Sequence, residues 1–358
     1  MRSRVVILSA FFTPYRSGAE ACAEEVAARL SNEFEIVMVT SRISSKLPKR
    51  EIVRGMNVVR LGTGTRLDPW LFPFLAPFTV RKLQPKIVHA ILESFAGLAL
   101  VFCALTAPKA KRILTLQSTN TSLFLFSMHW TAHVITAISS VLVRRATRFG
   151  RNDVVRIPNG ISLGDIRSAS EQYPKETGRI LFVGRMESMK GVDTLLRAFA
   201  ELLKSPSAPS YVHLHLVGDG SLRPSLEVLS KELGIHDRVE FLGRLTDMRL
   251  HRQFAEAEIF AGLSRSEALG NVFLEAQAAG CAVLATRTGG IPDIVHDDKS
   301  GLLISPDDEK AAAEALEKLA TDPQLRERLV KAGRENVLRY DWDLIAPKYA
   351  EVYRSLLL

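Results

Sequence analysis

The sequence predicts an α/β protein with two doubly wound, Rossmann-like domains that face each other across a cleft. Short apolar runs alternate with amphipathic stretches, and this alternation pauses at a turn at 158–160 and a polar stretch to 178 before it starts afresh. The chain has 358 residues, 47% of them hydrophobic, which is enough for two cores. We therefore expect domains at 1–160 and 161–340, and a C-terminal helix at 341–358 that packs back toward the first domain.

Each domain is expected to be a sheet with helices between its strands. The apolar runs predict strands at 5–9, 35–40, 57–61, 87–90, 112–116 and 154–157, then at 180–183, 212–217, 239–242, 259–263, 282–286 and 302–304. A helix is expected at 20–30, because Val26, Ala27 and Leu30 share one helical face. Ligands of such sheets bind at the carboxyl ends of the strands, so the active site is expected in the cleft.

The stretch from Glu267 to Glu275 joins one of these strands to the next helix. A loop at 264–270 leads into a helix at 271–279, and Gly280 stands where its C-cap belongs. The helix N-terminus offers unpaired N–H groups and a positive dipole end, which together make a seat for a phosphate.

The two glutamates have separate jobs, because Glu267 lies in the loop and Glu275 lies inside the helix. Neither neutralises a phosphate, but carboxylates accept hydrogen bonds from hydroxyl groups. A ligand with phosphate and several hydroxyls, such as a nucleotide sugar, would satisfy both. The alternative is a helix with a solvated glutamate and an ordinary capping loop.

Three more loops follow predicted strands. The loop at 184–191 carries Arg185 and Lys190, which suit a diphosphate as a planar fork and a point charge. Gly18 lies where the loop after the first predicted strand enters a helix, and its missing side chain lets a ligand approach the backbone. The loop at 218–221 lacks the third glycine of a dinucleotide fingerprint and is interpreted as a tight turn.

Charge divides the chain into two parts. Residues 1–160 carry 22 Lys/Arg and 9 Asp/Glu, a net charge of +13, whereas 161–358 carry 25 and 30, a net charge of −5. The basic part suggests an anionic partner, namely lipid headgroups, nucleic acid or a phosphorylated acceptor; a merely soluble surface is the alternative. Apolar aromatic segments at 69–75 and 123–130 are interpreted as core or lid, or as a membrane-contacting surface.

The cysteines and histidines do not suggest a metal or disulfide framework. Cys22, Cys103 and Cys281 are scattered and odd in number, which fits a reducing cytoplasm. His129 and His133 stand four residues apart without a third ligand nearby. We expect no cofactor, a metal-independent site, and a cytoplasmic protein that is soluble or peripheral on the inner face of the membrane.

A set of short motifs runs in order through the second domain. They are Gly184-Arg185, Lys190-Gly191, Val217-Gly218-Asp219-Gly220, Phe241-Leu242-Gly243, Ser264-x-x-Glu267, Glu275-Ala276 and Gly289-Gly290. In order and spacing this set resembles the retaining glycosyltransferases of family four, which have the GT-B fold. The resemblance extends more weakly over 17–20, 88–90 and 157–161, so it covers nearly the whole chain.

The resemblance implies three residues at the reacting group. Arg185 and Lys190 would hold the donor diphosphate, and Glu267 would bind hydroxyls of the transferred sugar. In this family the leaving phosphate is thought to assist the acceptor on the same face, which retains the configuration without a clear protein base.

The resemblance also implies substrate contacts elsewhere. The backbone N–H groups of Gly270, Asn271 and Val272 would bind the distal phosphate and sugar. Glu275 would accept from the ribose hydroxyls, and Gly18 would close the site from the first domain.

Two residues depart from the family pattern. Ser17 stands where the family often has a first glycine, and Gln117 stands where many members have a histidine near the sugar. Glutamine can still hydrogen-bond to a substrate but cannot carry a proton.

The sequence therefore predicts a retaining glycosyltransferase that moves a sugar from a UDP- or GDP-sugar to an acceptor hydroxyl. The acceptor is expected to be a sugar or lipid-linked, as in cell-envelope polysaccharide synthesis, with an anionic membrane surface nearby and no nucleic acid partner. The alternatives are a sugar-nucleotide epimerase of GT-B-like fold and a non-catalytic sugar-nucleotide-binding protein.

Overall fold

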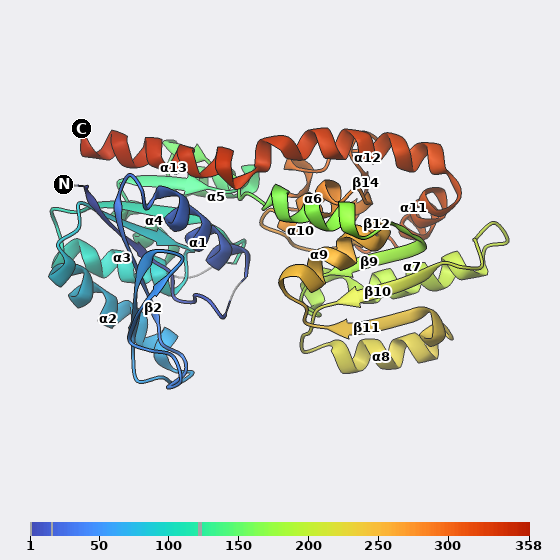
Figure 1. The fold of residues 1–358 in the computed structure, drawn as a ribbon, viewed down its shortest axis with the longest axis horizontal. Coiled ribbons are helices and arrows are strands. Elements are labelled where there is room, and N and C mark those ends of the chain that lie inside the picture. The colour runs from blue at the N-terminus through green and yellow to red at the C-terminus, as the bar shows by residue number, and fades with distance from the viewer. Residues whose placement is uncertain (1, 16, 121–123) are drawn as a thin grey trace. The chain divides into compact units, whose positions relative to one another are not determined.

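The computed structural model describes residues 2–15, 17–120 and 124–358, and it divides into two units (Figure 1). Unit 1 consists of Met1–Gly160 together with Trp342–Leu358, and unit 2 consists of Ile161–Asp341. Each unit is an α/β layer structure around one sheet, which confirms the predicted α/β class with two Rossmann-like domains. Leu123, the first residue of the second aromatic segment, lies outside the described residues.

Unit 1 is built on an eight-stranded sheet that is parallel except for one edge strand, β3. In sheet order the strands are β3 (Arg50–Val53), β4 (Met56–Leu61), β2 (Glu35–Ser41), β1 (Arg4–Leu8), β5 (Ile87–Ile91), β6 (Lys111–Leu116), β7 (Val134–Ala137) and β8 (Val154–Arg156). The register places Val6 of β1 opposite Val37 of β2 and Val88 of β5. The sequence predicted six of these strands and missed β3 and β7, which have only four residues each.

Helices cover both faces of this sheet. They are α1 (Gly18–Leu30), α2 (Asp68–Leu83), α3 (Phe95–Thr106), α4 (Leu125–Thr131), α5 (Ser140–Arg148) and α13 (Trp342–Leu357). Val5 and Ile7 of β1 share a buried core with α1 and α13. The alternating residues Val6 and Leu8 point to the other face, where α2 and α3 contact β1.

The C-terminal helix α13 is anchored in unit 1 by a polar contact as well as by apolar packing. Tyr353 of α13 lies 2.7 Å from Nδ1 of His89 on β5, and the other ring nitrogen of His89 lies 2.6 Å from Thr115. Burial lowers the pKa of His89 to about 3, so this histidine is neutral at physiological pH.

Unit 2 is built on a six-stranded parallel sheet. In sheet order its strands are β11 (Val239–Gly243), β10 (His213–Val217), β9 (Glu176–Val183), β12 (Ala257–Gly262), β13 (Ala282–Thr286) and β14 (Leu302–Ile304). Its helices are α6 (Leu163–Gln172), α7 (Val192–Lys204), α8 (Arg223–Glu232), α9 (Asp247–Glu256), α10 (Asn271–Ala278), α11 (Glu309–Thr321) and α12 (Pro323–Val337). All six predicted strands are confirmed.

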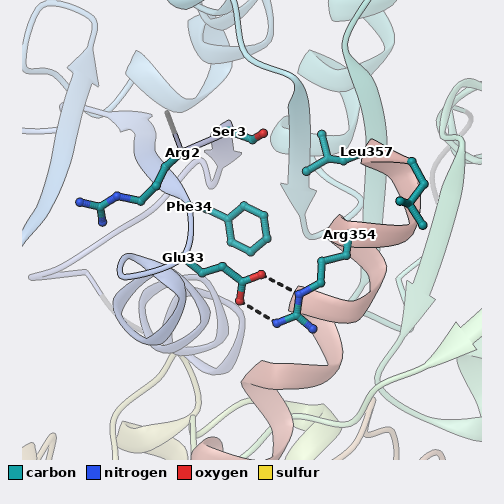
Figure 2. A pocket seen from close by; sticks show the side chains of 7 residues that line it. Arg2, Ser3, Glu33, Phe34, Arg354 and Leu357 are labelled. Atoms are coloured by element: carbon teal, nitrogen blue, oxygen red, sulfur yellow. Dashed lines mark hydrogen bonds and ion pairs between the residues drawn. The ribbon is translucent and has the colours of Figure 1, made fainter.

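The structure was searched for membrane-spanning helices and for cavities. In the described part of the chain, no helix combines the length and the apolar character needed to cross a bilayer. A hollow of about 850 Å³ in unit 1 is lined by Arg2, Ser3, Glu33, Phe34, Arg354, Leu357 and Leu358 (Figure 2). It lies at the amino end of β1, where Arg354 makes hydrogen bonds of 2.6 and 2.7 Å to Glu33. It is therefore remote from the carboxyl edge of the sheet, where ligands of such folds bind.

Candidate active site

The strand order of unit 2 reverses between β9 and β12, because β10 and β11 extend the sheet on one side of β9 and β12 to β14 on the other. The loops that leave these two strands, 184–191 and 263–270, therefore meet at the position where α/β sheets bind ligands. Lys190 of the first loop and Glu267 of the second form an ion pair, and each side chain is 15% exposed. The structure thus brings two predicted site residues together.

Glycines allow these loops to approach closely. Gly191 has φ of +62°, and a Cβ there would lie 2.0 Å from the carbonyl oxygen of Leu263. Gly289 has φ of +55°, and a Cβ there would lie 1.8 Å from the carbonyl oxygen of Glu267. No side chain fits at either position, so glycine is required to hold the Glu267 loop in place.

Arg265 joins the same loops through hydrogen bonds and was not predicted from the sequence. Its guanidinium donates to the carbonyl oxygen of Ser188 at 2.5 Å and to Asp193 at 2.8 and 3.0 Å. It also donates to Asp307 at 2.6 Å. These partners follow β9 and β14, so one side chain joins three loops. The only sequence signal was its place between Ser264 and Glu267.

The N-terminus of α10 opens beside this pair. Gly270 precedes the helix with φ of +93°, and a Cβ there would lie 2.6 Å from the ring of Phe273. Asn271 and Val272 begin the helix and are half-buried. The N–H groups of a first helical turn have no intrahelical partner and sit at the positive end of the dipole. Glu275 follows in the second turn, also half-buried.

Arg185 is placed differently from Lys190, since its side chain is exposed. Its Nη2 lies 3.7 Å from the sulfur of Met189 in the same loop. The neighbouring loop at 218–221 supports this one, because a Cβ on Gly218 would lie 1.8 Å from the carbonyl oxygen of Gly184. Gly218 therefore serves close backbone packing, in line with the interpretation of this loop as a tight turn.

At the carboxyl edge of unit 1 the strand order reverses between β1 and β5. Gly18 begins α1 beside this point and is exposed, so its backbone is open to a ligand. The preceding Ser17, where the family often has glycine, donates its backbone N–H to Glu20 at 2.8 Å. This contact closes the first turn of α1 from the side of its N-cap.

A buried polar cluster lies at the same edge, and its side chains hydrogen-bond to one another. Gln117 and Asn159 pair through their amides, with N–O distances of 3.0 and 2.9 Å. Glu93 accepts from the backbone N–H of Gln117 at 2.8 Å and forms an ion pair with Arg145. The side chain predicted to contact the sugar therefore already has a protein partner for both its donor and its acceptor.

Metal-ligating side chains were also sought in the described part of the chain. Within residues 2–15, 17–120 and 124–358, no three His, Cys, Asp or Glu side chains are grouped to hold an ion. His129 is buried against the ring of Phe149, with centroids 5.1 Å apart. The chain has an Asp-x-Asp sequence at 341–343, and its Asp343 lies 2.7 Å from Arg29 of α1.

Two family models match adjoining parts of the chain. Residues 165–336 match the model described as glycosyl transferases group 1, and residues 16–165 match the model described as glycosyltransferase family 4. Together they cover the site of unit 2 as well as Gly18 and Gln117 of unit 1. This chain belongs to the family-four glycosyltransferases.

Individual relatives are similar to this chain over part of their length. A D-inositol 3-phosphate glycosyltransferase of Corynebacterium urealyticum is 39% identical over 179 residues, which are 49% of this chain and 42% of that protein. The chain spans about half the length of the curated relatives that it matches, for example 50% of the corresponding protein of Corynebacterium jeikeium.

Solved structures confirm the GT-B architecture. A sucrose-phosphate synthase of Thermosynechococcus elongatus superimposes with a TM-score of 0.83 at 22% identity and covers 99% of both chains. An Anabaena protein solved with UDP and glucose gives a TM-score of 0.78 at 19% identity and covers 98% of this chain and 99% of its own. At these identities the likeness concerns the fold.

Proposed function

We propose that this protein transfers a glycosyl group from a nucleoside diphosphate sugar to an acceptor hydroxyl with retention of configuration. One observation carries the proposal: Lys190 and Glu267 meet at the strand-order reversal of unit 2, beside the N-terminus of α10. A cation, a helix N-terminus and a carboxylate within one site suit a ligand that carries phosphate and hydroxyl groups.

Each residue has a role that its position supports. Lys190 and the exposed Arg185 neutralise the charge of the diphosphate, so these two side chains take the role that a metal ion would otherwise have. Glu267 exchanges its ion pair with Lys190 for hydroxyls of the transferred sugar, and Glu275 accepts from the ribose. The N–H groups of Asn271 and its neighbours Gly270 and Val272 bind phosphate oxygens.

The reaction balances without a protein base. The bond between the anomeric carbon and the phosphate oxygen breaks, and the acceptor oxygen bonds to the same face of that carbon. The acceptor proton passes to the departing diphosphate, whose charge Lys190 and the α10 N-terminus stabilise. The assignments of Gly18 and Gln117 as substrate contacts stay predictions.

The donor is proposed to be a UDP- or GDP-sugar, and the Anabaena protein bound to UDP supports a nucleotide at this kind of site. The acceptor is proposed to be a sugar or lipid-linked molecule at the inner face of the cytoplasmic membrane. The net charge of +13 on residues 1–160 supports an anionic surface as the partner.

A panel of UDP-, GDP- and ADP-sugars tests the proposal by thermal shift, since a ligand at 100 times its Kd stabilises the folded state by about 2.7 kcal/mol. The nucleotide sugar that raises Tm is then supplied with sugar and lipid-linked acceptors, and the anomer formed is read by NMR. EDTA is expected to leave the rate unchanged. Conversion of the donor to an epimeric nucleotide sugar in the absence of an acceptor would identify an epimerase. Binding without any turnover would identify a non-catalytic binder.

A further inference from the structure

Helix α2 of unit 1 carries apolar side chains on its outward as well as its inward face. Its inward residues Phe72, Ala76 and Val80 are fully buried against the sheet. Its large exposed side chains, including its N-cap, are Leu67, Trp70, Leu71, Phe74, Leu75 and Phe78. Trp70, Phe74 and Phe78 are spaced four residues apart and are 67%, 56% and 61% exposed, so they form a ridge along the outside of the helix.

The neighbouring helix α3 widens this ridge into a surface. The ring of Trp70 packs edge-on against Phe95, with centroids 5.1 Å apart, and Phe74 packs against Phe102 at 5.4 Å. Leu105, near the end of α3, is 82% exposed. These contacts pack Trp70 and Phe74 against α3 and still leave each side chain more than half exposed.

The exposed charged residues of segment 66–86 are all basic. Arg66 precedes α2, and Arg81, Lys82 and Lys86 lie at its end, all of them exposed. The only carboxylate in residues 66–86 is Asp68, which is buried. Asp68 accepts hydrogen bonds from backbone N–H groups of the preceding loop, so its carboxylate is not presented at the surface.

We propose that this α2 surface, formed by the six apolar side chains of α2 and its four flanking basic residues, docks on an anionic lipid bilayer. Aromatic and leucine side chains enter the headgroup boundary, and the basic residues at both ends of the helix contact lipid phosphates. A protein partner or a second copy would need acidic groups opposite these four cations, whereas an anionic bilayer supplies them at any orientation about its normal. The proposal deepens the proposed function by placing the acceptor at the membrane.

Flotation of the full chain with vesicles tests the proposal. We expect recovery with equimolar phosphatidylglycerol and phosphatidylcholine, and little recovery with phosphatidylcholine alone. Each basic residue near an anionic surface contributes about fivefold to binding, so Arg81→Gln with Lys82→Gln lowers the partition coefficient roughly 25-fold. Phe74→Asp with Phe78→Asp lowers it at least tenfold, because charged groups replace the inserted rings.

Matched variants in unit 2 control for general surface effects. Val228→Asp with Met248→Asp changes two side chains that are 53% and 49% exposed, and Lys231→Gln with Lys299→Gln removes two exposed charges. Both pairs are expected to float like the wild type. Melting curves verify that each variant folds.

Fluorescence gives a direct readout of insertion. In Trp130→Phe the remaining tryptophans are Trp70 and the buried Trp342. Emission is expected to shift to the blue with anionic vesicles and to be quenched by brominated lipid. Equal binding by Phe74→Asp/Phe78→Asp and the wild type would overturn the proposal. The proposal would also be overturned if the wild type did not bind vesicles but formed a dimer that Phe74→Asp/Phe78→Asp dissociates. Lys190→Ala is expected to float normally, so failure of the donor site and failure of the α2 surface are distinguishable.

Discussion

The two units present the same topological feature in opposite states. At the strand-order reversal of unit 2, Lys190 and Glu267 stand in a site floored by glycines. At the reversal of unit 1, Glu93 is tied to Arg145 and to the backbone of Gln117. One carboxyl edge thus carries a partly exposed Lys190–Glu267 pair beside a helix N-terminus, and the other binds Glu93 and Gln117 to buried protein partners.

The comparison shows that a doubly wound sheet supplies a location but not a function. In unit 2 the loops at this location are held together by glycines that have no room for a side chain and by the hydrogen bonds of Arg265. In unit 1 the chain instead exposes its functional candidates on the outer face, as the aromatic ridge of α2. The following predictions test this division, beginning with the largest effect.

Replacing Gly191 with alanine should disrupt the site of unit 2. The new Cβ would meet the Leu263 carbonyl oxygen at 2.0 Å, so the loops after β9 and β12 must separate. A misplacement of about 1 Å costs on the order of a hundredfold in turnover. We expect that loss in kcat/KM, together with about 3 kcal/mol of unfolding free energy.

Gly234→Ala is the matched control, because Gly234 has φ of +70° and no atom within 4 Å of a new Cβ. The Gly234→Ala variant should lose only about 1–2 kcal/mol of unfolding free energy, because alanine is disfavoured in the left-handed region, and its kcat/KM should not change. Equal kinetics in the two variants would show that the loop contact at Gly191 does not shape the site.

Lys190→Ala removes one of the two cations that are proposed to bind the diphosphate in unit 2. A charge-assisted contact is worth about 1.5–3 kcal/mol, so kcat/KM for the donor should fall at least tenfold. Lys310→Ala, on the exposed surface of α11, serves as the control and should not change it. Wild-type kinetics in Lys190→Ala would remove the basis for a diphosphate at this position.

Gln117 tests whether the unit 1 edge is closed. Gln117→Ala leaves the Asn159 amide without its two partners, which should cost about 1–3 kcal/mol of unfolding free energy. Asn159→Ala should cost a similar amount, and the double variant less than the total of the two, with a coupling of about 0.5–3 kcal/mol. If Gln117 also contacts the sugar, its variant alone lowers kcat/KM beyond that of Asn159→Ala.

Most of the fold could be predicted because strands in parallel sheets are buried on both faces and read as continuous apolar runs. β13 at Ala282–Thr286 and β14 at Leu302–Ile304 have the predicted bounds. The edge strand β3 was missed, because its sequence Arg50-Glu51-Ile52-Val53 is exposed or half-buried and forms no continuous apolar run. Its pairing with β4 is decided by a turn at Arg54 and Gly55, which both have positive φ.

The candidate site was predicted in part for a related reason. The Lys190 and Glu267 loops are adjacent because β9 pairs with β12, and the sequence marks both loops with glycine. Arg265 could not be assigned from sequence, since its partners Asp193 and Asp307 are 72 and 42 residues away. The α2 ridge was left open between core and membrane surface, because Pro69 to Leu75 contains both buried and exposed apolar residues.

The smallest predicted effect concerns Asp68, which anchors the start of α2 in unit 1. Its carboxylate accepts from the backbone N–H groups of Ile43, Thr63, Gly64 and Thr65 at 2.7–3.2 Å. Burial by itself raises the pKa of Asp68, but the bonds from Gly64, Thr63, Thr65 and Ile43 outweigh it and lower the pKa below the ordinary value of 3.8. A carboxyl group with a lowered folded-state pKa stabilises the fold above its unfolded pKa, and this contribution is lost as the pH falls through the folded value.

Asp68→Asn keeps one oxygen acceptor but not the charge, so we expect a loss of about 1 kcal/mol at neutral pH. The difference in unfolding free energy between wild type and variant should be constant above about pH 5 and shrink below about pH 4. Urea unfolding at several pH values measures this difference. Because Asp68 is buried, the substitution should leave kcat/KM with soluble acceptors unchanged. Vesicle binding should weaken only if the first turn of α2 unfolds. A constant difference down to pH 3 would mean that the carboxylate charge does not hold this loop.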